Sequence, residues 1–385
     1  MKLKFILITL LLLPCMGIAQ SQKVKRIMTE VEKKVAPDKR QIVYDIIAKE
    51  KNNGVLFLSG KTSEASALDA LTNALKANHI KYRNNVTVFG NDKWALPRIS
   101  VANLRTKPGH GSEMASQALM GTPVRLLEQD GDWWRVQTPD GYIAWVIDNS
   151  LAMKTPEEMQ KWRSANRVVV TSTYQTRCYY SPTASGPRDV VSDLVNGNIL
   201  ELASSQPVSG RLHIILPDGR EAWVDKKDVT PIEKWAAQDF DAQHILDMAY
   251  SMEGQPYLWG GTSTKSLDCS GLAKVSYLSN GIILRRDASQ QALTGSRIEA
   301  KDWRDCQAGD LLFFGNAQTG KVTHVAIYDH DGNYVHSSGR VKRNSVDPAS
   351  ESYLTTPFLH CVRIAGNEGS DGIIRVRDHN WYFNL

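Results

Sequence analysis

The spacing of apolar and polar positions predicts a small mixed domain at the start of the chain. Apolar residues recur along 42–47 and 65–77 in the manner of amphipathic helices, and the apolar runs 55–58 and 86–88 are typical of strands. Residues 20–94 are therefore predicted to form an α/β domain. It carries no chemical motif, so we expect a packing or spacing role.

The middle of the chain contains an internal repeat. Pro139-Asp140-Gly141 is followed by Ala144-Trp145-Val146, and both tripeptides recur 78 residues later, from Pro217 and from Ala222. In each copy the Pro-Asp-Gly supplies turn chemistry between two apolar, β-prone runs. Short strands with frequent turns predict two small β-barrels. We assign them to residues 95–152 and 165–231.

Two polar stretches separate these modules from their neighbours. Residues 153–163 and 232–241 are rich in polar and charged side chains, and we interpret them as linkers. The last domain then runs from residue 240 to residue 385.

A cysteine lies at the predicted start of a helix in this last domain. Cys269 precedes the apolar positions of 272–278, and the helix is expected to stop at Asn280-Gly281. In the first turn, unpaired N–H groups and the helix dipole favour a thiolate and lower its pKa. Cys269 is therefore a candidate nucleophile, although an isolated cysteine is more often a small buried apolar side chain.

Two histidines lie on a predicted β-hairpin around Asp331-Gly332. A two-residue loop would put His324 and His336 on opposite faces. A three-residue loop, 330–332 with Gly332 left-handed, sets His336 opposite Ala326 and diagonal to His324 on the same face. We predict the three-residue loop.

This register would give Cys269 a base and the base a partner. A nucleophile needs a base within hydrogen-bond reach, and the base needs a third group that fixes its tautomer. Cys269, His324 and His336 would supply these roles in that order. A single histidine is more commonly a satisfied core or surface side chain, and His330 in the turn is expected to be one.

The start of the chain has the pattern of a secretory signal. Lys2 and Lys4 precede an apolar run over 5–13 and the small residues of 17–19, so residues 1–19 are predicted to be removed. An uncleaved anchor is the alternative, but the run is shorter than the roughly 20 residues of a membrane span. Cys15 raises the possibility of a lipid-anchored form, because lipoprotein signals also end in a cysteine. Pro14 disfavours this form, since a proline directly before the cysteine resembles no usual lipoprotein cleavage site. We expect export to the periplasm or cell envelope, with no transmembrane helix in the mature chain.

The composition of the chain limits which kinds of partner and cofactor are expected. With 42% hydrophobic and 23% charged residues, the chain has the profile of a soluble globular protein. The net charge of +5 falls to +3 without Lys2 and Lys4, which is too small to indicate a nucleic-acid partner. The other cysteines lack the spacing of a zinc site, so no metal or other cofactor is expected. A disulfide is possible outside the cytoplasm, but nothing in the sequence predicts one.

The last domain resembles NlpC-type peptidases, a family of bacterial cell-wall cysteine endopeptidases with a papain-like α+β core. The matching pieces, in the expected order over most of 240–363, are Pro256-Tyr257-Leu258-Trp259-Gly260-Gly261, Asp268-Cys269-Ser270-Gly271, Gly309-Asp310-Leu311-Leu312-Phe313-Phe314 and the strands of His324 and His336.

This resemblance implies hydrolysis of peptidoglycan stem peptides, commonly between γ-D-glutamate and the following diamino acid. Cys269 would attack the γ-carbonyl, His324 would protonate the leaving amine, and water would release the acyl-enzyme. The N–H of Cys269, with help from Tyr257, would stabilise the oxyanion.

Segments of the repeat resemble bacterial SH3-like domains, which often accompany cell-wall enzymes. The first copy matches around 101–105 and 131–136; the second is diverged, with Arg177-Cys178-Tyr179 where the first has Asn103-Leu104-Arg105. The resemblances together imply an α+β multidomain protein: a small N-terminal α/β domain, two SH3-like β-barrels and a C-terminal papain-like domain.

Relatives with SH3-like domains in front often recognise a free N-terminal L-Ala-γ-D-Glu, and their first SH3-like domain forms part of the pocket wall. The matching residues are Glu113 and Tyr142 from that domain, with Asp268, Ser270 and Asp287 from the last. An acidic pair would hold the ammonium of L-Ala, and Arg286 or Ser270 the glutamate carboxylate. Ala288 departs from the Ser expected after Asp287.

Two other functions stay open. The same papain-like core serves amidases and acyltransferases, so the triad does not fix the leaving group. The chain could also be a wall-binding protein with an inert last domain, although an intact Cys, His and His argue against it.

Overall fold

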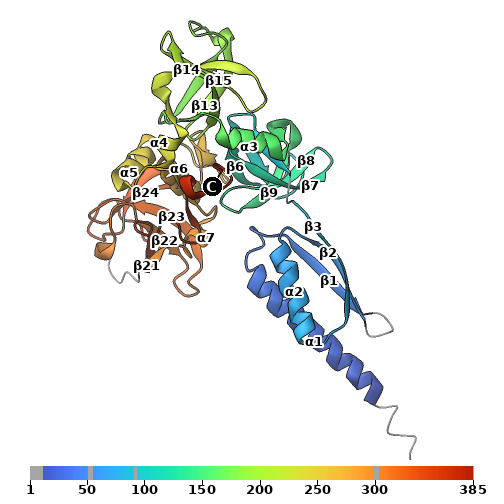
Figure 1. Ribbon diagram of the computed structural model, residues 1–385. Helices are drawn as coiled ribbons and strands as arrows, with labels where there is room; N and C mark the ends of the chain where they lie inside the picture. The colour runs from blue at the N-terminus through green and yellow to red at the C-terminus, as the bar shows by residue number, and fades with distance from the viewer. Residues whose placement is uncertain (1–11, 51–54, 91–92, 299–302, 385) are drawn as a thin grey trace, which may run out of the picture. The chain divides into compact units, whose positions relative to one another are not determined.

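The computed structural model describes residues 12–50, 55–90, 93–298 and 303–384 (Figure 1). It divides into two compact units, Met1–Asn91 and Asp92–Leu385, which we describe separately. The charged and apolar parts of the predicted leader, up to residue 11, lie outside the described residues. No helix in the described ranges has both the length and the apolarity needed to cross a bilayer.

The first unit is a three-stranded sheet with two helices. Its strands lie in the order β1-β2-β3; β1 and β2 are antiparallel, and β2 and β3 are parallel through the crossover helix α2. Leu58, Leu71 and Leu75 are fully buried in its core. The elements are α1 (Leu12–Val35), β1 (Tyr44–Glu50), β2 (Leu56–Thr62), α2 (Ala65–Ala77) and β3 (Tyr82–Val88).

The expected helix α2 is confirmed, but the expected helix at 42–47 is wrong, because this stretch leads into strand β1. Tyr44 and Ile46 are buried while Asp45 and Ile47 are exposed, which is the alternation of a strand. Helix α1 runs through the predicted cleavage site before Gln20 without interruption.

The repeat forms two antiparallel sheets of seven strands each. The first has the order β10-β4-β7-β8-β9-β5-β6, and the second has the corresponding order β17-β11-β14-β15-β16-β12-β13. This one-to-one correspondence confirms the duplication. The first module contains β4 (Trp94–Pro97), β5 (Val101–Arg105), β6 (Met114–Leu119), β7 (Val124–Asp130), β8 (Trp133–Gln137), β9 (Ile143–Ile147), η1 (Asp148–Ser150) and β10 (Leu151–Lys154). The second contains β11 (Arg167–Val170), β12 (Gln175–Tyr179), η2 (Pro187–Asp189), β13 (Val190–Val195), β14 (Ile199–Val208), β15 (Arg211–Ile215), β16 (Glu221–Asp225), η3 (Lys226–Asp228) and β17 (Val229–Pro231).

Each Pro-Asp-Gly lies between two paired strands, as predicted. Strands β8 and β9 pair across the first, and β15 and β16 across the second. Gly141 and Gly219 have φ values of 85° and 86°, which favour glycine.

Each of the two stretches interpreted as linkers contains a packed helix instead. Helix α3 (Pro156–Ser164) begins at Thr155 with a capping box to Glu158 and buries Met159 and Trp162. Helix α4 (Ile232–Ala236) buries Trp235. The linker interpretation is wrong because a few large apolar side chains among many polar ones are enough to hold a short helix against its neighbours.

The last domain is a six-stranded antiparallel sheet, in the order β21-β26-β22-β23-β24-β25, with helices α5 and α6 against one face. That face buries Phe313 and Val335 against Ile245 of α5 and Leu272 of α6. The elements are α5 (Ala242–Ser251), β18 (Thr262–Ser263), β19 (Ser266–Leu267), α6 (Cys269–Ser279), β20 (Ile282–Leu284), α7 (Ala288–Gln291), β21 (Ser296–Ile298), η4 (Trp303–Asp305), β22 (Leu311–Gly315), β23 (Val322–Tyr328), β24 (Asn333–Ser338), β25 (Arg340–Ser345), β26 (Phe358–Arg363), β27 (Ile373–Arg375) and η5 (Val376–Asp378).

Candidate active site

Cys269 is the first residue of α6, as predicted, and its side chain is partly exposed. Asp268 caps the helix, since its Oδ1 accepts a hydrogen bond of 2.7 Å from the N–H of Gly271. The helix ends at Asn280, before Gly281 with φ 71°.

The two histidines lie together on the hairpin of β23 and β24. Ile327 pairs with Val335, and Tyr328 with Tyr334, so the loop has the predicted three residues and Gly332 is left-handed with φ 78°. The Nε2 atom of His324 lies 2.7 Å from Nδ1 of His336, which confirms that the imidazoles meet on one face.

Asn344 joins this pair, and the sequence analysis did not identify it. Its Nδ2 donates to the carbonyl of Ser352 at 2.8 Å, so its Oδ1 is the atom that faces Nε2 of His336 at 2.9 Å. Nε2 of His336 therefore carries a proton, and its Nδ1 accepts from Nε2 of His324. This leaves the lone pair of His324 on Nδ1.

The surroundings of the thiol do not lower its pKa as expected. Burial, reinforced by the carboxylate of Asp268, raises the pKa of Cys269 to about 11. The N–H groups of Val325 and Ser270 bond to the sulfur and act in the opposite direction, but burial prevails. The expectation of a lowered pKa is wrong because it considered the helix terminus without the side chains that cover it.

The histidines are also held neutral. Burial, followed by the neighbouring imidazole of His336, lowers the pKa of His324 to about 3. Burial lowers the pKa of His336 to about 4, against the opposing effect of the hydrogen bond that His336 donates to Asn344. The resting site therefore combines a thiol with neutral imidazoles.

Tyr257 lies close to Cys269. Burial, together with the charges of Cys269 and Asp268, raises the pKa of the Tyr257 phenol. Its N–H donates to the carbonyl of Gly339 at 3.0 Å, which ties the segment before α6 to the end of β24. The phenol stays protonated and can act as a hydrogen-bond donor.

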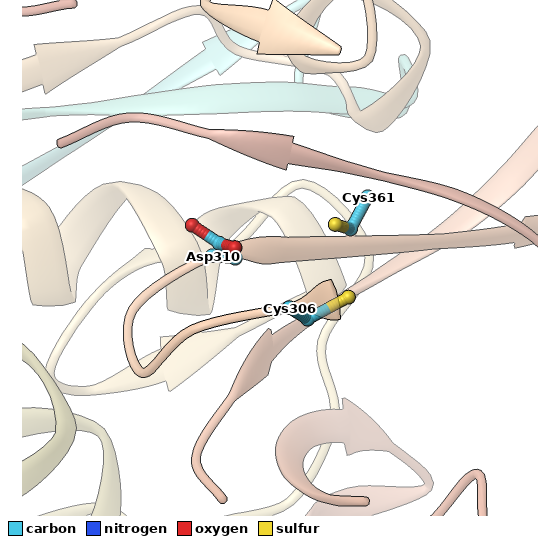
Figure 2. Close-up of side chains that lie close together, drawn as sticks. All are labelled: Cys306, Asp310 and Cys361. Carbon is cyan, nitrogen blue, oxygen red and sulfur yellow. The ribbon is translucent and has the colours of Figure 1, made fainter. Parts of the chain in front are cut away.

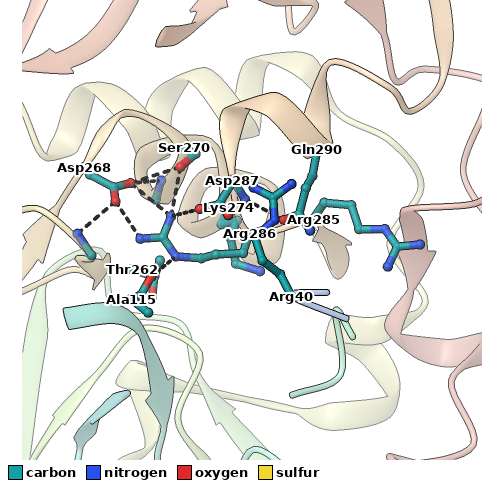
Figure 3. A network of polar contacts seen from close by, with 12 residues as sticks. Arg40, Ala115, Thr262, Asp268, Ser270, Lys274, Arg285, Arg286, Asp287 and Gln290 are labelled. Carbon is teal, nitrogen blue, oxygen red and sulfur yellow. Dashed lines mark hydrogen bonds and ion pairs between the residues drawn. The ribbon is translucent and has the colours of Figure 1, made fainter. Parts of the chain in front are cut away.

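Asp268, Ser270 and Arg286 form a buried cluster (Figure 3). Arg286 bonds through Nη2 to Oδ2 of Asp268 at 2.5 Å and through Nη1 to Oγ of Ser270 at 2.9 Å. Its Nε donates to the carbonyl of Ala115, in the first repeat module, at 2.9 Å. The N–H of Gly260 also donates to Asp268. These charges are thus neutralised within the protein, and Arg286 is only 2% exposed.

The remaining predicted binding residues lie in different surroundings. Glu113 is exposed, and its Oε1 accepts a 2.7 Å hydrogen bond from Nε1 of Trp259, which is 61% exposed. Tyr142 is 9% exposed and lies near Arg286. Asp287 is half-buried at the start of α7, with its Oδ1 4.0 Å from Nη1 of Arg286. The structure thus brings Glu113 of the first module to the segment before Cys269.

Among the described residues, one group of side chains offers three metal-ligating atoms close together: Cys306, Asp310 and Cys361. It includes none of Cys269, His324 and His336.

Two family models match the chain. Residues 254–363 match the NlpC/P60 family, and residues 104–151 match the bacterial dipeptidyl-peptidase Sh3 domain. The first match contains Cys269, His324 and His336, and the second contains Glu113 and Tyr142.

Curated relatives match across these domains. The chain is 32% identical over 261 residues to a gamma-D-glutamyl-L-lysine dipeptidyl-peptidase of Bacillus cereus, covering 64% of this chain and 74% of the relative. It is 28% identical over 263 residues to dipeptidyl-peptidase 6 of Lysinibacillus sphaericus, covering 66% of this chain and 92% of the relative.

A solved structure shares the fold. The crystal structure of an NlpC/P60 family protein from Bacillus cereus superimposes with a TM-score of 0.59 at 24% identity, covering 71% of this chain and 99% of that one.

Proposed function

Because the chain belongs to the NlpC/P60 family, we propose that it cuts peptidoglycan stem peptides between γ-D-glutamate and the diamino acid, with Cys269 as nucleophile. The observation that carries this proposal is the hydrogen-bonded pair of His324 and His336 on the strands beside the first turn of α6.

The tautomers give each imidazole a role. The lone pair on Nδ1 of His324 takes the proton of the Cys269 thiol as the sulfur attacks the γ-carbonyl. His336 accepts from Nε2 of His324 and thereby stabilises the imidazolium, which then protonates the leaving amine. Water, deprotonated by His324, releases the acyl group. The N–H of Cys269 and the phenol of Tyr257 would donate to the oxyanion.

The resting neutral state fits this order of events. With a raised thiol pKa and a lowered imidazole pKa, the proton moves during attack rather than before it. The positive charge on His324 then forms only while the oxyanion forms, so the two charges arise together.

We propose that the substrate enters with a free N-terminal L-Ala. Glu113 and Asp287 supply carboxylates for its ammonium, and Tyr142 shapes the wall beside Arg286. Asp268, Ser270 and Arg286 saturate one another, which supports a role in holding the first turn of α6 rather than a direct contact with the glutamate carboxylate.

The test uses the purified protein, Cys269→Ala and two pairs of peptides. L-Ala-γ-D-Glu-diaminopimelate and L-Ala-γ-D-Glu-L-Lys are each offered with a free and with an acetylated N-terminus, and products are read by mass spectrometry. We expect release of L-Ala-γ-D-Glu from the free-amine peptides by the intact protein alone.

Each other result points to a different function. Cleavage of free and acetylated peptides alike would remove the N-terminal requirement while keeping the peptidase. Transfer of the acyl group to an added amine would indicate an acyltransferase. Wall binding without any product would indicate a binding protein.

We further propose that the protein acts at the cell envelope, with the leader removed before Gln20. N-terminal sequencing of the secreted or periplasmic protein tests this, and a chain that retains Lys2 and Lys4 would contradict it.

A further inference from the structure

Two cysteines outside the triad lie side by side in the last domain (Figure 2). Cys306 precedes β22, and Cys361 lies on the adjacent strand β26, opposite Leu312. Cys306 is 7% exposed and Cys361 is fully buried. Both belong to the apolar cluster on the sheet face away from α5 and α6, with Phe314 and Tyr334.

Their sulfurs are neighbours rather than two separate core side chains. The Sγ atoms and a carboxylate oxygen of Asp310 lie within 4.8 Å of one another. The thiol of Cys306 hydrogen-bonds to Cys361, which is the leading cause of its raised pKa. A disulfide requires the two sulfurs to approach to about 2.05 Å, so its formation would bring these neighbouring sulfurs closer together than they lie here.

A metal ion is the rival occupant, and the carboxylate opposes it. Asp310 accepts from Nε and Nη2 of Arg363 at 3.2 and 2.9 Å, and from the N–H of Gln307 at 2.8 Å. A cation here would have to displace the guanidinium and remain beside its positive charge. Without Asp310 only two sulfurs remain, which is fewer than a structural zinc site uses.

We propose that Cys306 and Cys361 form a structural disulfide in the exported protein. The cell envelope is the kind of compartment in which disulfides persist, so the proposal depends on the location proposed above but not on the reaction. The bond would form before the apolar cluster closes, because the folded sheet buries both sulfurs.

An external disulfide can serve as the oxidant of the two protein thiols. One thiolate attacks an external disulfide, releasing one thiol and leaving a mixed disulfide on the chain. The second thiolate attacks that intermediate and releases the second thiol. Two protein thiols are oxidised, one external disulfide is reduced, and two protons pass to the departing thiolates.

The bridge would close the part of the chain that carries the base. Residues 307–360 contain β23, β24 and β25, and with them His324, His336 and Asn344. A cross-link between β26 and the segment before β22 would reduce the conformational freedom of the unfolded chain around the hairpin of β23 and β24. It would stabilise the domain without touching the reacting atoms.

The experiment maps the bond in the intact protein. The full chain is produced with its leader and recovered from the envelope, then unfolded and alkylated without reductant. A second sample, reduced and then refolded with glutathione disulfide, is treated alike. We expect the tryptic peptides 305–321 and 344–363 to be joined, two hydrogens lighter than their sum, while Cys178 and Cys269 are alkylated.

Two variants provide the controls. Reduction should lower the thermal midpoint by about 5–10 °C in the wild type and in Cys178→Ser, whereas Cys361→Ser should show no change on reduction. Alkylation of both Cys306 and Cys361 in each wild-type sample would overturn the proposal, whether or not Cys361→Ser folds. One tightly bound zinc per chain, lost in Cys361→Ser, would overturn it in favour of the metal.

Discussion

At the scale of single residues, Asn344 decides which nitrogen of His324 carries a proton. The carbonyl of Ser352 sets the orientation of the Asn344 amide. The amide oxygen then sets which nitrogen of His336 carries the proton, and His336 in turn sets the tautomer of His324. A leucine at position 344 would fill similar space but accept no hydrogen bond. His336 could then turn its protonated nitrogen toward His324, and the base would lose its orientation.

We therefore expect Asn344→Leu to lower kcat by about 10–100-fold with KM nearly unchanged. Asn344→Asp keeps an acceptor oxygen and should retain most of the activity. Ser352→Ala is the matched control, because Asn344 donates to the backbone carbonyl of Ser352, which this substitution keeps. Steady-state kinetics on the free-amine peptide provide the measurement. Equal rates for the Leu and Asp variants would show that Asn344 does not orient the histidines.

The neutral state of the site has its own pH signature. Since burial raises the pKa of Cys269 to about 11, the thiol is protonated at neutral pH, and its thiolate fraction rises tenfold per pH unit below that value. We expect the rate of Cys269 alkylation by iodoacetamide to climb steadily between pH 7 and pH 10. Peptide mapping distinguishes Cys269 from the buried cysteines. A rate that is constant from pH 6 to pH 9 would mean that a thiolate–imidazolium pair exists at rest.

At the scale of elements, the first turn of α6 depends on a close backbone contact. A Cβ on Gly271 would lie 1.9 Å from the carbonyl oxygen of Gly261, a backbone atom that cannot rotate away. The same turn holds Cys269 and the cap of Asp268. Any displacement of this turn therefore moves Cys269 relative to His324.

Gly271→Ala should destabilise the protein by about 1–3 kcal/mol and reduce peptide hydrolysis by at least tenfold. Gly111→Ala is the control, because no heavy atom lies within 4 Å of the corresponding Cβ. Urea unfolding and peptide kinetics measure both effects. Wild-type activity in a folded Gly271→Ala protein would show that the helix start tolerates displacement.

Elements whose apolar positions follow one clear helical or strand period could be predicted from the sequence. Features that depend on contacts between residues distant in sequence could not. The boundaries of α2, the end of α6 and the hairpin register follow from periodicity and turn chemistry. Strand β1 was misassigned because residues 42–47 are too short to distinguish the two periods. Asn344 escaped notice because its role depends on the pairing of β24 with β25, which no local motif encodes. The pKa of Cys269 depends in the same way on side chains distant in sequence.

At the scale of the whole second unit, the first repeat module and the last domain share buried polar contacts. Gln117 and Thr262 exchange hydrogen bonds of 2.9 Å between β6 and β18. Gly260, with φ 81°, brings its backbone against the carbonyl of Met114, next to Glu113. The module is thus part of the scaffold that holds the segment before Cys269.

The duplicated turn provides a direct comparison within one chain. Asp140, in the first Pro-Asp-Gly, pairs with Lys274 of α6 at 2.5 Å; the side chain of Asp140 is buried and that of Lys274 is 16% exposed. Burial acts to raise the pKa of Asp140, but the ammonium of Lys274, with hydrogen bonds from Thr138 and Tyr142, lowers that pKa overall. Asp218, at the same place in the second copy, pairs instead with Arg98 and Arg220, whose side chains are each 42% exposed.

We therefore expect unequal costs from the same substitution. Asp140→Asn would leave the largely covered ammonium of Lys274 without its anion and lower the free energy of unfolding by about 3 kcal/mol. Asp218→Asn should lower it by less than about 1 kcal/mol, because water can solvate the two arginines. Urea unfolding of both variants makes the comparison, and peptide kinetics should show a rate loss only for Asp140→Asn. Equal destabilisation would mean that the two turns are interchangeable, and that the first module is not coupled to α6 through this pair.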